Sequence, residues 1–212
     1  MELSWFRRPG TGGEGGTLNL CYNAVDLHVV KGLANEPAVL DGEQPVSFAV
    51  LLEQIAALAG AMRALGVEPE SVVGVLLDDP SDRLLMLLAC LRLGAVHVEL
   101  SEVSPGIEID RHQPHLVATS RPLVYADHAP AACLVRGIAS EDDSRDLDWD
   151  IAVKAGRTDP APCAALAPGS TAYVVAGTAV PIAAAVEDRS WAGRACATLC
   201  AGQTIDLTGD LA

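Results

Sequence analysis

Apolar residues recur every three or four positions between residues 47 and 66, the spacing of one face of an α-helix. They are Leu51, Ile55, Leu58, Met62 and Leu65. Ser47 belongs to the residue types that cap helix N-termini, and glycine, here Gly66, commonly ends helices. The pattern therefore predicts a helix that begins after Ser47 and stops at Gly66.

A second helix is predicted over residues 80–93. It opens at Asp79-Pro80, where proline is tolerated in the first turn, and it stops at Gly94. Continuous apolar runs at residues 71–77 and 95–100 flank this helix and are typical of short buried strands. An order of strand, helix and strand favours a parallel sheet with a helical crossover.

The rest of the chain continues this alternation more weakly. Before residue 170 we expect a short helix at residues 107–112, strands at 115–119 and 123–125, a third short apolar run at 133–137, an acidic solvated connection at 140–150, and a Pro- and Ala-rich loop at 158–169. After it we expect a strand at 172–176, a return strand at 182–186 and a closing helix at 188–201. The whole pattern predicts an α/β fold with a layered, mostly parallel sheet flanked by helices.

The composition fits a globular chain. Of the 212 residues, 50% are hydrophobic and 20% are charged, which lies outside the range of disordered proteins. A glycine-rich stretch at residues 9–16 precedes the first ordered-looking segment. We therefore expect residues 1–17 to form a flexible N-terminal segment and residues 18–212 to form a single α/β domain.

The net charge and the cysteines limit the binding partners and the cellular compartment that we expect. The formal net charge is −14, which repels nucleic-acid phosphates and anionic lipid surfaces, so we expect neither as a partner. The strongest apolar run, residues 84–91, is too short to cross a bilayer, and no secretory signal is visible. Six cysteines without a CxxC pair indicate free thiols in a reducing, cytoplasmic protein.

One segment could hold phosphate. The loop at residues 177–182 follows an apolar strand and begins with Gly177 and Thr178, whose backbone N–H groups and hydroxyl are the donors that phosphate loops use. No lysine follows Lys154, and a single Gly-Thr pair is a weak signal. An ordinary turn between two strands explains the same residues, so both interpretations stay open on the residues alone.

The remaining titratable residues give no catalytic or metal site. His112 and His115 are three apart, but Pro114 between them breaks the helical spacing that a ligand pair needs. Cys196 and Cys200 are one helical turn apart and are typical of a packed helix face. We therefore expect no metal and assign no catalytic residue.

Several collinear segments resemble the short-chain acyl-CoA synthetases, the AMP-forming acetate and propionate ligases of the adenylate-forming superfamily. The segment WF at residues 5–6, followed by LNLCYNAVDLHV at residues 18–29, is similar to an N-terminal signature of that family. The segments LACLRLGAVH at residues 88–97 and PHLVAT at residues 114–119 match further stretches. Residues 145–150 and 159–163 look especially like the propionate-activating branch. The resemblance implies one lobe of that family's N-terminal domain, with ATP, AMP or CoA as ligands.

The chain also departs from the family pattern. Members carry a phosphate loop of the form (S/T)SGTTGxPKG after the strand at residues 172–175. With Gly177 and Thr178 placed on its Gly-Thr, the loop is one residue short, and Ile182 stands where the lysine belongs. Leu27 replaces a usual arginine. Because the sequence stops at Ala212, the resemblance also implies that the rest of the acyl pocket and the C-terminal catalytic domain are absent.

These observations give three functional hypotheses. The first is a truncated, degenerate acetate/propionate–CoA ligase relative without ligase activity by itself. The second is a non-catalytic interaction module that binds an adenylating enzyme, a carrier protein or a second copy of itself as a homo-oligomer, through surface left exposed by truncation. The third is an AMP- or CoA-binding protein that uses Gly177 and Thr178 of the former phosphate loop.

Overall fold

Both long helices form where the apolar spacing predicts them. A computed structural model describes residues 3–10, 15–42 and 44–208. In it, α1 (Phe48–Ala64) begins after Ser47, whose hydroxyl accepts the Val50 N–H at 3.3 Å. α2 (Pro80–Leu93) begins after Asp79, whose carboxylate accepts two first-turn N–H groups, and ends at Gly94 with a φ of 78°. The predicted caps are confirmed.

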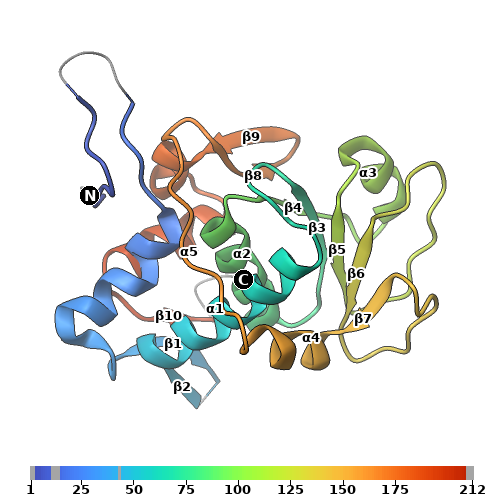
Figure 1. Cartoon of the computed structure of the whole chain (residues 1–212), viewed down its shortest axis with the longest axis horizontal. Helices are drawn as coiled ribbons and strands as arrows, with labels where there is room; N and C mark the ends of the chain where they lie inside the picture. Colours follow the sequence, from blue (N-terminus) through green and yellow to red (C-terminus); the bar gives the residue numbers. More distant parts are fainter. Residues whose placement is uncertain (1–2, 11–14, 43, 209–212) are drawn as a thin grey trace.

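The predicted parallel sheet is also confirmed, and it has seven strands in the order β7-β6-β5-β3-β4-β8-β9 (Figure 1). Every neighbouring pair is parallel except β8 and β9, which form an antiparallel hairpin. The strands are β3 (Val72–Leu76), β4 (Val96–Glu99), β5 (Leu116–Thr119), β6 (Ala132–Val135), β7 (Asp146–Asp148), β8 (Thr171–Val175) and β9 (Thr178–Pro181).

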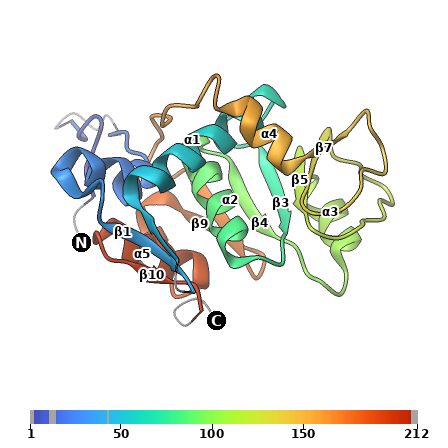
Figure 2. The same cartoon turned by 90° about the horizontal axis from the view of Figure 1, so that it is seen from below.

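Helices cover both faces of this sheet. On one face α2, α4 (Trp149–Gly156) and α5 (Trp191–Cys200) bury the larger apolar cluster, and α1 lies across α2 and α4 (Figure 2). On the other face α3 (Pro105–His112) packs Ile109 against a smaller cluster that includes Val98 and Val117. Val73 and Val75 face the larger cluster while Leu76 faces the smaller one, as expected for a strand buried on both sides.

A second, smaller sheet and two helical segments before α1 were not predicted, and the last strand of this sheet comes from the end of the chain. The sheet has the order β10-β1-β2, with β1 (Pro37–Asp41), β2 (Gln44–Ser47) and β10 (Ile205–Asp206). Two π-helical segments, Tyr22–Asp26 and Val29–Leu33, come before it. Among the described residues, no helix is both long and apolar enough to cross a membrane.

Residues 1–2 and 11–14 lie outside the described part of the chain, and so does half of the glycine-rich stretch at residues 9–16. The described residues beside it include Trp5, which packs against the larger core, and Arg7, which pairs with Thr17. Flexibility of residues 1–17 stays a prediction.

The expected strand at residues 123–125 is wrong. In the sheet β5 lies between β3 and β6, so no position beside it is left for the segment that follows it. Instead, the Thr119 hydroxyl closes a turn by accepting the Arg121 N–H at 3.0 Å and donating to the Arg121 carbonyl at 2.7 Å. Val124 is then exposed rather than buried in the sheet.

The interpretation of residues 140–150 as a solvated connection is also wrong, because its carboxylates organise local structure. Asp146 in β7 accepts the backbone N–H groups of Glu141 and Asp142 at 3.0 and 3.1 Å. Asp148 caps α4 by accepting the Ile151 N–H at 3.0 Å. The acidic run thus contains an edge strand and the start of a helix.

The return strand after β8 begins at Thr178 and not, as expected, within residues 182–186, which form a 3-10 helical turn (Ile182–Glu187). Val175 pairs directly with Thr178, so only Ala176 and Gly177 connect the two strands. Their φ angles, 48° and 77°, are both positive, as in the type I′ turn of a two-residue hairpin. The connection is therefore a tight turn.

This turn predicts opposite effects of substitution at its two positions. Ala176→Asn places a residue that tolerates positive φ at a position where alanine is strained, and should raise the free energy of unfolding by about 0.5–1 kcal/mol. Gly177→Ala should lower it by about 1 kcal/mol, although a Cβ there meets open space. Urea unfolding of both variants measures this, and equal effects would contradict the turn geometry.

Candidate functional site

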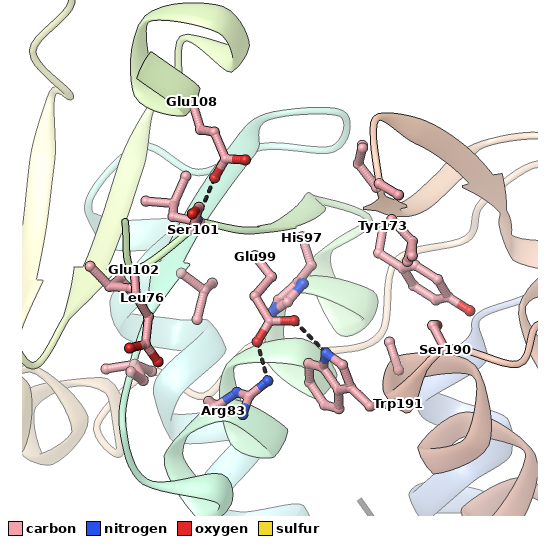
Figure 3. Close-up of a pocket in the computed structure, with 17 residues that line it drawn as sticks. Leu76, Arg83, His97, Glu99, Ser101, Glu102, Glu108, Tyr173, Ser190 and Trp191 are labelled. Atoms are coloured by element: carbon pink, nitrogen blue, oxygen red, sulfur yellow. Dashed lines mark hydrogen bonds and ion pairs between the residues drawn. The ribbon is translucent and has the colours of Figure 1, made fainter. Parts of the chain in front are cut away.

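A cavity of about 410 Å³ opens at the carboxyl ends of β3, β4 and β8 (Figure 3). Its walls come from residues 75–77, 83, 97, 99–102, 108 and 173–176 and from the start of α5 at residues 190–192. In open parallel sheets, ligands bind in crevices at this end of the strands. The position of this cavity in the sheet makes it the candidate functional site.

Glu99, the last residue of β4, is the centre of the polar contacts in this cavity (Figure 3). Its carboxylate forms an ion pair with Arg83 of α2 and accepts the Trp191 Nε1–H at 2.5 Å. The Arg83 guanidinium also lies over the Trp191 ring, 4.9 Å from its centroid. These three side chains join α2, β4 and α5, so the arrangement of the cavity wall is fixed by contacts between separate elements.

His97 lies behind this group, between Val73 and Tyr173 in the sheet register. Its ring packs edge-on against Trp191 at a centroid distance of 5.8 Å, and its Nε2 has no hydrogen-bond partner among the described residues. Burial, and then the positive charge of Arg83, lower the pKa of His97 to about 3. The imidazole is therefore neutral near pH 7.

The charges around the cavity are unfavourable for phosphate. Besides Glu99, its lining includes Glu102, which pairs with Arg121 at 3.0 Å, and Glu108, which accepts the Ser101 N–H. Arg83 is the only cation in the lining, and neither lysine of the chain is part of it. Three carboxylates against the guanidinium groups of Arg83 and Arg121 leave a net negative charge, which disfavours a triphosphate. The lining suits a small neutral or cationic group better.

The predicted phosphate-binding residues lie beside this cavity and do not line it. Ala176 reaches the lining, whereas Gly177 and Thr178 are exposed at the turn and at the first position of β9. Ile182, which stands at the lysine position of the resembled loop, is 1% exposed and belongs to the larger core. Phosphate binding by Gly177 and Thr178 stays a prediction.

A second cluster was missed by the sequence, which gave no group of potential metal ligands. Cys21, Asp26 and Cys163 bring one sulfur or oxygen atom each to within 4.8 Å of the others. Asp26 also forms a buried ion pair with Arg92 at 2.9 Å. Cys163 is far from the other two in sequence, and only the fold brings it to them, so spacing along the chain gives no signal for this group.

The other candidate side chains lie in structural positions. The ring of His115 contacts the Leu65 carbonyl at 3.0 Å, and His112 ends α3 on the far side of Pro114. Cys196 is buried on α5, and Cys200 is half-buried one turn later, as a packed helix face predicts.

Comparison with known proteins gives a consistent relationship. Residues 28–175 match the sequence profile of the family described as AMP-binding enzyme. The chain is similar to the mitochondrial acyl-CoA synthetase short-chain family member 3 of Rattus norvegicus, at 26% identity over 181 residues, 70% of this chain and 26% of that protein. It is also similar to acetyl-coenzyme A synthetase 1 of Candida albicans, at 36% identity over 120 residues, 54% of this chain and 17% of that protein.

The acetyl-coenzyme A synthetase of Halorhodospira halophila is 34% identical over 106 residues, which are 47% of this chain and 16% of that protein. The chain thus spans about a quarter of the length of the rat relative and less of the other two.

The neutral state of His97 predicts a pH dependence. Because an unfolded histidine has a pKa near 6.5, the unfolded chain binds one more proton here between about pH 6.5 and pH 3. The contribution of neutral His97 to the free energy of unfolding is complete above that pH range and is lost as the pH falls through it. His97→Gln should reduce the slope of unfolding free energy against pH between pH 4.5 and 6 by about 1.4 kcal/mol per unit.

Urea unfolding across this pH range measures the slope. His28, whose pKa burial also lowers, should supply a slope that the variant retains. Identical slopes for the variant and the parent protein would show that His97 is protonated in the folded state.

Proposed function

We propose that this chain, which belongs to the AMP-binding enzyme family, does not form acyl adenylates by itself. The observation that carries the proposal is the β8–β9 turn, where a two-residue connection stands in place of an extended phosphate loop. In such a hairpin the backbone groups of Val175 and Thr178 bond to each other across the ladder. They are not free to surround an anion.

The energetics support the same conclusion. Electrostatic donors aimed at developing charge are typically worth about 3–4 kcal/mol each in a transition state. Here the position of the resembled lysine holds a buried isoleucine, Ile182, and the adjoining cavity is lined by carboxylates. A chain that lacks these donors loses most of the stabilisation that phosphate chemistry requires.

The relatives indicate the carboxylate class from which this chain derives. They are short-chain acyl-CoA and acetyl-coenzyme A synthetases, of which the chain covers 26% and 16%. We propose a degenerate member of the acetate/propionate–CoA ligases, with propionate supported by the resemblance of residues 145–150 and 159–163. The six thiols, none of which is bridged, support a cytoplasmic setting.

Self-association is a second candidate function, favoured by exposed apolar residues beside the cavity. Val103, Ile107 of α3 and Val124 are 93%, 63% and 87% exposed. They belong to neighbouring segments, because the Val124 carbonyl lies 3.3 Å from where a Cβ on Gly106 would stand. Adjoining exposed apolar residues of this kind mark protein interfaces. The net charge of −14 opposes contact between two copies, so salt should promote it.

Absence of ligase chemistry is tested by pyrophosphate exchange. With ATP, Mg²⁺ and propionate or acetate, the protein should exchange labelled pyrophosphate into ATP no faster than a protein-free blank, while a full-length acetyl-CoA synthetase serves as positive control. Millimolar ATP, AMP or CoA should leave the melting temperature unchanged, since binding to the folded state would raise it. Pyrophosphate exchange faster than the blank would contradict the proposal. A shift in melting temperature without such exchange would support retained ligand binding.

Self-association is tested by analytical ultracentrifugation at low and high salt. The weight-average mass should rise from monomer towards dimer as salt screens the negative charge. Ile107→Ser combined with Val124→Ser should abolish the rise, and Ile151→Ser, an exposed apolar residue of α4, serves as the matched control. A monomer at every salt concentration rules this function out.

A further inference from the structure

Four side chains from three distant segments meet beneath α1. The Arg92 guanidinium at the end of α2 bonds both oxygens of Asp26 at 2.9 and 3.1 Å and lies 3.9 Å from the Cys21 Sγ. Cys163, in the segment between α4 and β8, places its Sγ 3.7 Å from Asp26. The two sulfurs are therefore neighbours, within 4.8 Å of one another.

The local backbone aligns two of these groups. In the π-helical segment Tyr22–Asp26 the Leu27 N–H bonds the Tyr22 carbonyl, five residues back. Such wider turns bring residues five apart to nearly the same face, so Cys21 and Asp26 both point towards Arg92. In an ordinary α-helix, residues five apart diverge, and the cluster would not form. Single π-helical turns occur frequently at functional sites.

The surrounding contacts hold the two cysteine-bearing segments together independently of the thiols. The Asn19 side chain donates to the Ala164 carbonyl at 2.9 Å, and Leu18 pairs with Leu166. Arg92 also donates to the Ala161 carbonyl at 2.6 Å. Since a disulfide has an S–S length near 2.05 Å, the sulfurs need to approach by less than about 3 Å.

A metal ion fits this group poorly. Cys21, Asp26 and Cys163 supply only three ligand atoms, and the Arg92 guanidinium already occupies both oxygens of the carboxylate. A divalent cation would have to displace that permanent positive charge or lie beside it. A bond between the two sulfurs needs neither, because it removes no partner from Arg92.

We propose that Cys21 and Cys163 form an oxidant-sensitive pair that hydroperoxides convert to a disulfide. Hydrogen peroxide oxidises the Cys21 thiol to a sulfenic acid and is reduced to water. The Cys163 sulfur then attacks that sulfur, an S–S bond forms, and the hydroxyl leaves as a second water with the Cys163 proton. One peroxide thereby oxidises two thiols, and the disulfide joins Cys21, directly before the π-helical segment Tyr22–Asp26, to the segment before β8.

Access to this pair is from the side of Cys163, because Cys21 itself is buried. A cavity of about 400 Å³ is lined by Asp26 and Arg92, next to the sulfurs, and Cys163 is half-buried rather than enclosed. The hydrogen bond to Cys21, and then burial, raise the pKa of Cys163, so its proton leaves only as the S–S bond forms, together with the departing hydroxyl. Burial also raises the pKa of Cys90, Cys133 and Cys196 and that of Cys200 to about 12, so the short distance between the Cys21 and Cys163 sulfurs, at most 4.8 Å, and not thiol acidity, distinguishes this pair.

The test is peroxide treatment of the native chain, followed by blocking of free thiols and peptide mapping without reductant. We expect one cross-linked peptide pair containing Cys21 and Cys163, with a mass lower by two hydrogens, that dithiothreitol reverses. The melting temperature should rise by roughly 5–10 °C on oxidation, since the new bond closes a long loop. Cys163→Ser should abolish both effects, and Cys200→Ser, also half-buried, should keep both.

Three results would overturn the proposal. Peroxide could leave Cys21 and Cys163 open to alkylation, or cross-link a different pair. A melting shift that persists in Cys163→Ser would assign the effect to another group. Native mass spectrometry after addition of Zn²⁺ alone could instead show one tightly held ion that protects both thiols from peroxide, in which case the cluster is a metal site.

Discussion

The buried ion pair between Arg92 and Asp26 is the contact on which the arrangement of the chain depends. Its two side chains are 7% and 16% exposed, so removing either partner leaves an uncompensated charge, which typically costs about 3–5 kcal/mol. The same guanidinium bonds the Ala161 carbonyl. Arg92 therefore holds three parts of the chain in place: the π-helical segment Tyr22–Asp26, the end of α2 and the segment before β8.

The ion pair between Arg92 and Asp26 stabilises the fold independently of the phosphate chemistry that the family performs. The CYNAVD segment and the LACLRLGAVH segment, which carry the resemblance to acyl-CoA synthetases, meet each other at Asp26 and Arg92 and bury surface there. The contact between Asp26 and Arg92 does not involve the turn after β8, although residues 96 and 97 of the second segment lie in β4, which pairs with β8. In this chain the two segments bury surface at the ion pair, and the connection after β8 is a hairpin turn. Membership of the AMP-binding enzyme family describes the architecture, and the site decides the activity.

The sequence predicts the parts of the structure whose information is local. The apolar spacing and caps of α1 and α2 lie within single segments, and so do the buried runs of β3 and β4. In the small sheet β10 was missed because it is two residues long and pairs with β1, which is far away in sequence, whereas the local hairpin of β1 and β2 was overlooked. β7 was missed because its Asp-Leu-Asp sequence reads as a charged linker.

The same difference between local and non-local sequence information holds for the candidate site. Gly177 marks a loop in the sequence, but the alanine at position 176 is an unusual residue for a type I′ turn, so the return strand was placed too late. The Glu99, Arg83 and Trp191 group joins three elements and has no signature along the chain. The neutral state of His97 follows from its position between two strands, and periodicity alone could not give it.

The central claim is that the segment after β8 is a closed hairpin and not a phosphate loop. Hydrogen–deuterium exchange of residues 171–181, with and without ATP and Mg²⁺, tests it most directly. The hairpin account predicts that backbone amides paired between β8 and β9 exchange slowly in both conditions and that nucleotide changes nothing. Rapid exchange that becomes slow when ATP is added would contradict it.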